Sequence, residues 1–205
     1  MLTLYYSKGT SALAPHILLE EVGADYALKE VPIDTGAQAQ PAFQQVNPKG
    51  RVPALKAPEG VITENPAILG YIAAVHRDAQ MLPETPFDRA RAEAFNAYLC
   101  ATVHVAFAHM ARGARWTDDT DAQAALKPKV ADNLAECAEV IEKHLLKGPW
   151  AMGDRYTYCD PYLFLLPRWM AKAGVEIAPY PRLAAHHAAM QARPATLAAL
   201  AVHQV

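Results

Sequence analysis

The sequence predicts a mixed α/β domain at the N-terminus followed by an all-α C-terminal domain. Over residues 1–77, short β-prone runs and helical patterns follow one another in the order βαβ, a connection, then ββα. A helix that joins two strands implies that they are parallel, and a hairpin adds antiparallel strands, so we expect a mixed sheet with helices on both faces. From residue 87 to residue 205 the chain is alanine-rich and helically periodic, and residues 78–86 are the predicted linker.

The predicted βαβ unit begins with a strand over residues 2–6 and a turn that ends at Gly9. A helix follows from Ser11, because apolar residues recur at helical spacing until Gly23, a residue type that is common directly after a helix. The second strand is predicted over residues 26–33. The connection over residues 35–41 is polar and has weak helical potential.

The predicted ββα unit is a hairpin followed by a helix. Pro58-Glu59-Gly60 is the expected hairpin turn between two apolar runs. Asn65 is a candidate N-cap for the next helix, and Pro66 suits its first position. The expected helix extends to about residue 77.

The C-terminal region predicts two long helices, over residues 88–115 and 121–146. The string Thr157-Tyr158-Cys159-Asp160 matches a capping box and opens an apolar helix through Trp169, which Pro167 is expected to kink near its end. Further helices are expected over residues 181–190 and after Pro194. We expect the histidines of these last helices, His186, His187 and His203, to lie at the surface.

Charge and composition exclude several classes of protein. With 19 basic and 21 acidic residues the formal charge is −2, which gives no general field for a nucleic acid or an anionic membrane. No apolar run approaches the roughly 18 residues that span a bilayer, and the chain begins directly with a strand pattern, so we expect a cytoplasmic protein. Three cysteines without CxxC spacing predict buried thiols and neither a disulfide framework nor a zinc site.

Two adjacent residues have the chemistry to bind an α-amino acid head group. The helix start at Asn65-Pro66 offers unpaired backbone N–H groups to a carboxylate, and Glu64 beside it can pair with an ammonium. A simple helix cap at Asn65 and a solvated surface charge at Glu64 explain the same residues, so the spacing alone leaves both interpretations open.

Several local strings, in order along nearly the whole chain, resemble cytosolic glutathione S-transferases, and most of all the bacterial beta class. The most specific are Asn47-Pro48-Lys49-Gly50-Arg51-Val52-Pro53-Ala54-Leu55 and Thr63-Glu64-Asn65 with Ala67-Ile68; the others are residues 4–9, 13–17, 150–153 and 157–163. The resemblance implies a thioredoxin-like glutathione-binding domain over residues 1–77 and a helical domain with an acceptor-substrate cleft over residues 87–205. It also implies a homodimer with a role in detoxification.

The resemblance assigns glutathione, as co-substrate, to particular residues. The backbone of Val52, before a cis Pro53, pairs with the cysteinyl part, while Glu64 and Asn65 hold the γ-glutamyl end. Beta-class proteins often bind the glycyl carboxylate with a lysine after the second strand, which this chain lacks over residues 34–38, so Arg51 or Lys8 is the expected substitute. The residues expected to line the acceptor cleft are His104, Phe107, Arg112 and Trp169, the last beside Arg168.

The thiol-activating group is expected at the turn into the first helix, where a hydroxyl and the helix N-terminus both favour a negative sulfur. Ser11 is the first candidate, with Thr10 beside it, and Tyr6 ranks below them. Beta-class enzymes carry a cysteine at the position of Ser11. A serine can donate a hydrogen bond to a thiolate but cannot form a mixed disulfide, which favours conjugation or isomerisation over thiol–disulfide exchange.

The sequence therefore predicts a glutathione transferase that activates the thiol for attack on a hydrophobic electrophile. A glutathione-dependent isomerase or dehalogenase, which uses the same thiolate on another acceptor, and a non-catalytic ligand- or protein-binding module are the alternatives. Cys100 and His104 stand at i, i+4, but no second pair of ligands accompanies them, so we predict no metal site.

Overall fold

The computed structural model describes residues 1–204, which form two compact units. The first consists of residues 1–84 together with the end of the chain from Met190, and the second consists of Thr85–Ala189. Among the described residues, no helix has both the length and the apolar composition needed to cross a membrane.

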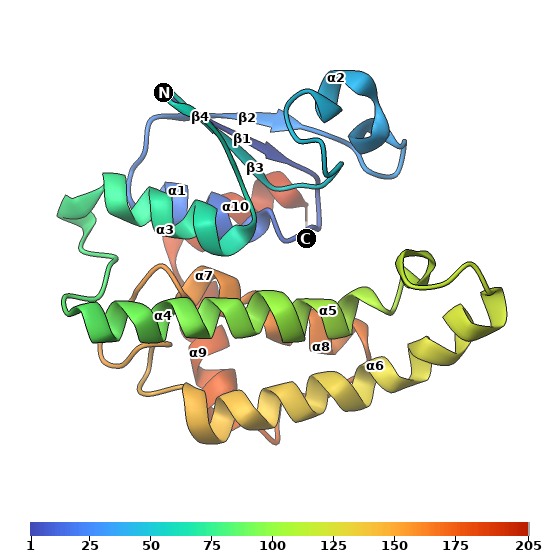
Figure 1. Cartoon of the computed structure of the whole chain (residues 1–205). Coiled ribbons are helices and arrows are strands. Elements are labelled where there is room, and N and C mark those ends of the chain that lie inside the picture. The colour runs from blue at the N-terminus through green and yellow to red at the C-terminus, as the bar shows by residue number, and fades with distance from the viewer. Residues whose placement is uncertain (205) are drawn as a thin grey trace. The chain divides into compact units, whose positions relative to one another are not determined.

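The first unit contains a four-stranded mixed sheet in the order β2-β1-β3-β4 (Figure 1). The strands are β1 (Leu2–Tyr6), β2 (Tyr26–Glu30), β3 (Ala54–Ala57) and β4 (Gly60–Thr63). β1 is parallel to β2 and antiparallel to β3, and β3 and β4 form the predicted hairpin. The mixed sheet expected from the sequence is confirmed.

The second strand ends earlier than residue 33, where the sequence predicted its end. Val31 still donates its N–H to the carbonyl oxygen of Tyr6 at 2.7 Å. The next residue is Pro32, which has no N–H for the sheet, so regular pairing with β1 ends at Glu30.

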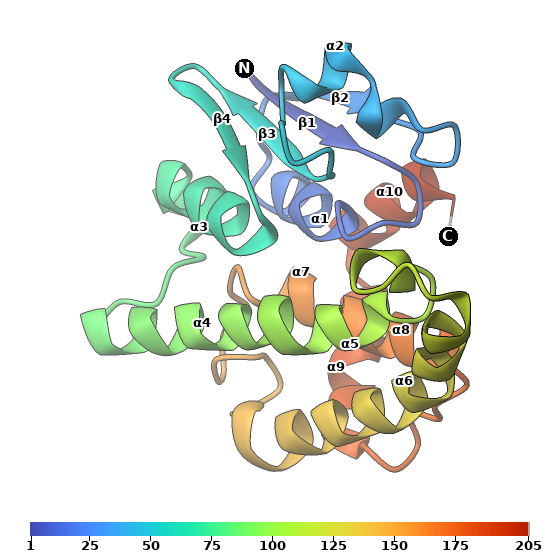
Figure 2. The same cartoon turned by 45° about the vertical axis from the view of Figure 1, so that its right-hand side comes forward.

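Helices cover both faces of the sheet (Figure 2). α1 (Leu13–Glu21), α3 (Asn65–Val75) and α10 (Pro194–His203) lie on one side, and α2 (Pro41–Gln44), with the short 3-10 turn Ala37–Ala39 before it, lies on the other. Adjacent residues of β1 therefore point to opposite faces of the sheet. Tyr5 packs against Phe43 of α2, with ring centroids 5.9 Å apart, whereas Tyr6 faces the helices α1 and α10.

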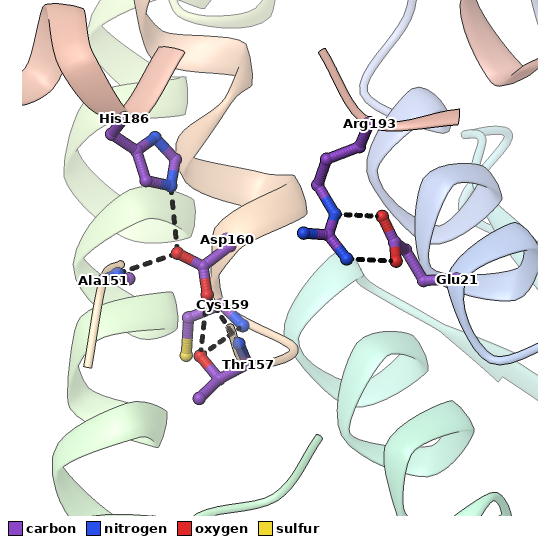
Figure 3. A network of polar contacts seen from close by, with 7 residues as sticks. All are labelled: Glu21, Ala151, Thr157, Cys159, Asp160, His186 and Arg193. Carbon is purple, nitrogen blue, oxygen red and sulfur yellow. Dashed lines mark hydrogen bonds and ion pairs between the residues drawn. The ribbon is translucent and has the colours of Figure 1, made fainter. Parts of the chain in front are cut away.

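α10 packs with the first unit, although the sequence assigned residues 87–205 to the helical domain. It packs along α1 and so belongs to the first unit. Arg193, directly before α10, holds both carboxylate oxygens of Glu21 at the end of α1 at 2.5 and 2.7 Å (Figure 3). Helical periodicity shows which face of a helix is buried but not which element covers it.

The second unit is entirely helical over its described residues apart from turns and one isolated bridge. Its α-helices are α4 (Pro86–Tyr98), α5 (His104–Ala108), α6 (Thr120–Val140), α7 (Asp160–Leu163), α8 (Leu165–Lys172) and α9 (Pro181–Gln191). A π-helical turn, Leu99–Val103, joins α4 to α5, and a second one, Ile141–Leu145, extends α6. The helix predicted over residues 88–115 therefore ends at Ala108 and is followed by a 3-10 turn, Gly113–Arg115.

The starts of α4 and α6 follow from their capping residues. Thr85 accepts the N–H of Asp88 at 3.0 Å, and Pro86 takes the first turn, so α4 begins two residues before the predicted start. Asp119 accepts the N–H groups of Asp121 and Ala122 and caps α6.

The apolar helix predicted through Trp169 is interrupted at Phe164, between α7 and α8. Pro167 has no N–H to donate to the carbonyl of Leu163, so the helical hydrogen-bond pattern is lost before the proline. The helix then continues beyond it to Lys172, so the kink lies earlier than the sequence predicted.

We expect Arg193→Met to lower the free energy of unfolding by about 2 kcal/mol, since the Glu21 side chain is only 8% exposed and loses its bidentate partner. Urea unfolding measures this change. Lys129→Met is the matched control, because its pair with Asp132 has side chains 60% and 64% exposed and should contribute less than about 0.5 kcal/mol. Equal effects of the two substitutions contradict the prediction.

Candidate functional site

The sheet register brings the segments around the predicted glutathione-binding residues to one edge of the first unit. Tyr5 pairs with Ala54, and Ala54 pairs with Thr63. Because these pairs are antiparallel, the next residues along each strand, Tyr6, Pro53 and Glu64, follow one another across the same end of the sheet. The turn into α1 also leaves the sheet at this end, directly after β1.

The two hydroxyl groups in the turn into α1 differ in their hydrogen bonds. The Thr10 hydroxyl donates to the carbonyl oxygen of Ser7 at 2.6 Å and accepts the N–H of Ala12 at 3.4 Å, so it holds the turn together. The Ser11 hydroxyl makes no hydrogen bond within residues 1–204, although the residue is only 7% exposed. Of the two, Ser11 therefore retains a donor for a ligand at the N-terminus of α1.

Tyr6, the third candidate, packs inside the first unit. Its ring centroid lies 5.1 Å from that of His203 and 6.4 Å from that of His16. Burial, followed by the negative charge of Glu30, raises the pKa of Tyr6 above its ordinary value. Because its ring packs against His16 and His203, Tyr6 is less free to meet a ligand than Ser11.

The loop before β3 has a rigid framework. The Asn47 side chain, which is 1% exposed, donates to the carbonyl oxygen of Arg51 at 2.6 Å and accepts the N–H of Lys49 at 3.1 Å. Gly50 has φ +60°, and a Cβ there would lie 3.1 Å from the carbonyl oxygen of Gln38, so only glycine fits without displacement. The loop ends in a cis peptide bond between Val52 and Pro53, as the resemblance implied.

The junction between β4 and α3 differs from the predicted cap. Asn65 is the first residue of α3 and not its N-cap; Glu64 takes the cap position with φ +73°, and its side chain makes no capping hydrogen bond. Asn65 is 4% exposed, and its side-chain oxygen has no hydrogen-bond partner within residues 1–204. Glu64 is exposed and is bound by Lys49, whose Nζ lies 2.5 Å from Oε1.

The sequence reasoning missed Lys49. Its position inside the Asn47–Leu55 string was visible, but its proximity to Glu64 depends on the hairpin register, which carries residue 64 back to the loop. The expected substitutes for the absent class lysine are placed differently. Arg51 and Lys8 are both exposed, and no ion pair of either is found within residues 1–204.

The second unit brings three of its four predicted acceptor-site residues together. The imidazole of His104 stacks on the indole of Trp169 with centroids 4.7 Å apart, and Phe107 stacks on the same indole at 5.2 Å. Buried Tyr162 lies edge-on to both His104 and Trp169, and its hydroxyl is 3.2 Å from Nδ1 of His104. Arg112 is exposed in the turn after α5 and is not among the ring contacts of this cluster within residues 1–204.

The capping-box string forms a buried polar network, shown in Figure 3. Asp160, with no exposed surface, accepts the N–H of Ala151, the N–H and hydroxyl of Thr157, and Nε2 of His186 at 2.7 to 3.0 Å. A carboxylate removed from water requires this number of donors. Asp160 is the first residue of α7 and Cys159 its N-cap, so the predicted box does not cap the helix with Thr157. The contacts instead join a loop and α9 to the start of α7, and we assign them to stability of the second unit.

The surface location predicted for the histidines is wrong for two of them and only partly right for the third. His186 is 1% exposed and His203 is 0% exposed, while His187 is partly buried. The helical spacing of these histidines could have predicted their burial. His186 shares the buried face of α9 with Leu183 and Met190. His203 shares the buried face of α10 with Thr196 and Ala199.

The predicted buried thiols are found at Cys137 and Cys159, while Cys100 is partly exposed. Within residues 1–204, no group of three or more histidine, cysteine, aspartate or glutamate side chains is arranged to hold a metal ion.

The sequence matches two family models. Residues 1–74 match the glutathione S-transferase N-terminal domain, and residues 106–201 match the glutathione S-transferase C-terminal domain. Two characterised proteins are similar over most of the chain. Glutathione S-transferase GstA of Escherichia coli O157:H7 is 30% identical, with 93% of each chain covered. A maleylacetoacetate isomerase of Pseudomonas aeruginosa is 29% identical, with 93% of this chain and 94% of that one covered.

Solved structures agree with the family models. A glutathione transferase homologue from Sulfitobacter, with bound glutathione, has a TM-score of 0.96 at 35% identity and covers 100% of this chain and 99% of its own. A bacterial beta-class glutathione S-transferase from Sphingomonas chungbukensis has a TM-score of 0.85 at 32% identity, with 98% of each chain covered. The predicted resemblance to beta-class proteins, with a thioredoxin-like first domain, is confirmed.

The partly buried imidazole of His187 is expected to make the stability of the second unit depend on pH. Burial, followed by the positive charges of Arg168 and His186, lowers the pKa of His187 to about 4 from 6.5. Between these values the unfolded chain binds a proton that the folded chain does not, so this group makes the protein less stable as the pH falls from 6.5 towards 4. We expect His187→Gln to lose less stability than the wild type between pH 7 and pH 5 in urea unfolding. Equal losses in the two proteins contradict this assignment.

Proposed function

Because this chain belongs to the glutathione S-transferase family, we propose that its first unit binds glutathione as co-substrate and that Ser11 activates the thiol. The main observation is that the Ser11 hydroxyl makes no hydrogen bond within residues 1–204, whereas the Thr10 hydroxyl is used by the turn and the Tyr6 ring packs against His203. It also precedes α1, whose N-terminal dipole favours a negative charge.

The proposed reaction needs little chemistry from the protein beyond a stabilised thiolate. The thiol loses its proton to solvent, the Ser11 hydroxyl donates a hydrogen bond to the resulting sulfur anion, and Ser11 keeps its own proton. The sulfur lone pair forms the new bond to the electrophilic carbon, and the leaving group departs with the electron pair of the bond that breaks. Each pKa unit by which the thiol is lowered corresponds to about 1.4 kcal/mol of preference for the thiolate.

Glutathione itself is held, in this proposal, along the shared end of the sheet. The backbone of Val52 pairs with the cysteinyl part beside Pro53, Glu64 accepts the α-ammonium, and the N-terminus of α3 at Asn65 receives the α-carboxylate. Arg51 is the proposed partner of the glycyl carboxylate, since its side chain is exposed in the adjacent loop.

The acceptor is proposed to be a planar, hydrophobic electrophile. His104 and Phe107, which are partly exposed and stack on the buried indole of Trp169, offer aromatic surface that suits aromatic or conjugated molecules. Arg112, exposed near the same helix end, is the proposed contact for a polar or anionic substituent. Conjugation of such molecules is a detoxification reaction, and we place it in the cytoplasm, where a reduced glutathione pool keeps thiols unpaired.

Isomerisation is the second candidate function, because a relative of similar identity is named maleylacetoacetate isomerase. The same thiolate adds to a conjugated double bond, the carbon–carbon bond rotates, and elimination returns both the thiolate and the rearranged product. Glutathione is regenerated in this reaction and consumed in conjugation, so the two are distinguished by following the thiol concentration.

We expect Ser11→Ala to lower kcat/KM for conjugation of an aryl halide about tenfold to a hundredfold, because the thiolate loses a charge-assisted hydrogen bond. Steady-state assays and the ultraviolet absorbance of bound thiolate at neutral pH measure the effect. Tyr6→Phe is the control and should retain activity, since its hydroxyl is not proposed to touch the sulfur. Wild-type activity in Ser11→Ala contradicts the assignment. If the wild-type protein does not bind millimolar glutathione, the transferase proposal fails altogether.

We expect Ser11→Cys to form a mixed disulfide with oxidised glutathione, because a cysteine thiolate at this position would lie beside the glutathione sulfur. Intact-protein mass spectrometry detects the added mass of one glutathione. The matched control is the wild-type protein with its three native cysteines. The same adduct on the wild type contradicts the prediction.

We propose that the protein is a homodimer, as transferases of this family typically are. Sedimentation velocity should give the mass of two chains at micromolar concentration. A single-chain mass throughout that range contradicts the proposal.

A further inference from the structure

Lys49 and Glu64 form an ion pair that stability does not explain. Their atoms Nζ and Oε1 are 2.5 Å apart, but the side chains are 46% and 50% exposed. An ion pair this exposed contributes at most about 1 kcal/mol to folding. The backbone of Glu64, at φ +73°, is in a left-handed region that disfavours any residue except glycine. The fold thus keeps an unfavourable backbone conformation at the residue that carries this carboxylate.

The position of Lys49 is also built into the fold. Its backbone N–H is bound by the buried side chain of Asn47 at 3.1 Å, and the next residue, Gly50, takes a conformation that its contact with Gln38 restricts to glycine. The backbone of Lys49 is therefore held in place, and its side-chain ammonium contacts Glu64 directly after β4.

Asn65 adds an independent sign of a ligand beside this pair. Its side-chain oxygen is buried and accepts no hydrogen bond within residues 1–204. A buried acceptor without a donor is unfavourable unless a ligand or water supplies one. Directly beside it, the start of α3 offers backbone N–H groups and a positive dipole end.

Together these groups supply both kinds of partner that a zwitterion needs. Lys49 and the start of α3 are positive, while the carboxylate of Glu64 and the side-chain oxygen of Asn65 are acceptors. An α-amino acid head group offers a carboxylate to the first pair and an ammonium to the second. Glu64 alone could not distinguish such a head group from a simple amine.

We propose that Lys49 is a further glutathione-binding residue, whose ammonium pairs with the α-carboxylate of the γ-glutamyl head group and selects for it. This inference rests on the proposed function. In the ligand-free protein Lys49 keeps Glu64 in place; in the complex the carboxylate of the ligand binds Lys49 and the ammonium of the ligand binds Glu64.

The test compares Lys49→Met with Lys49→Arg and with Lys56→Met, an exposed lysine of β3 outside the site. Isothermal titration is done with three thiols: glutathione, γ-glutamylcysteine, which lacks the glycyl residue, and an analogue with γ-aminobutyrate in place of γ-glutamate, which lacks the α-carboxylate. Thermal unfolding verifies that each variant is folded.

We expect Lys49→Met to weaken glutathione and γ-glutamylcysteine equally, by about tenfold, as the loss of one charge-assisted contact predicts. Binding of the decarboxylated analogue should be weak in the wild type and unchanged in Lys49→Met. Lys49→Arg should retain most of the affinity, and Lys56→Met all of it.

Three results overturn the inference. Unchanged glutathione affinity in Lys49→Met removes Lys49 from the site. A loss for glutathione but not for γ-glutamylcysteine assigns Lys49 to the glycyl carboxylate. An equal loss for the decarboxylated analogue means that Lys49 acts only by holding Glu64. In each case the wild type still binds glutathione, which separates these results from failure of the transferase proposal.

Discussion

The pairing of β1 with strands on both sides is the constraint on which the candidate site depends. Leu4 at its centre is fully buried and pairs with Leu28 of β2 and Leu55 of β3. This double pairing determines where β1 ends and therefore where the turn into α1 begins. The Ser7–Thr10 hydrogen bond then closes that turn and leaves Ser11 at the start of the helix. A one-residue shift in register would move every side chain of β1 to the opposite face of the sheet.

The same sheet gathers residues from distant parts of the sequence. β3 and β4 return the chain so that Glu64 lies beside the loop that carries Lys49, although the two residues are 15 apart. Neither is buried, so their ion pair contributes little to the stability of the fold. The positive φ of Glu64 and the unpartnered oxygen of Asn65 are small losses of stability at one place. Such losses are usual where a protein keeps groups ready for a ligand.

The second unit uses its polar and aromatic side chains in two separate ways. Asp160 and its donors are entirely buried and join a loop, a helix start and α9. In the cluster of His104, Phe107 and Trp169, the indole is buried and the other two rings, which stack on it, are partly exposed. The first set satisfies a buried carboxylate with hydrogen bonds, and the second packs rings against one another.

Local periodicity, prolines, glycines and caps are enough to predict the order of strands and helices, the mixed sheet, the hairpin and the two-part organisation. The residues also indicate Glu64 and Asn65 as a head-group site, and the family resemblance indicates Ser11. The Thr10 hydroxyl bonds to Ser7 only three residues away, but the sequence does not show which of two adjacent hydroxyl groups the turn uses. The fold is needed to show that Tyr6 packs against His203, that Lys49 reaches Glu64, that α10 returns to α1 and that His186 is a buried partner of Asp160. These contacts join residues that are distant in the chain, so local patterns do not encode them.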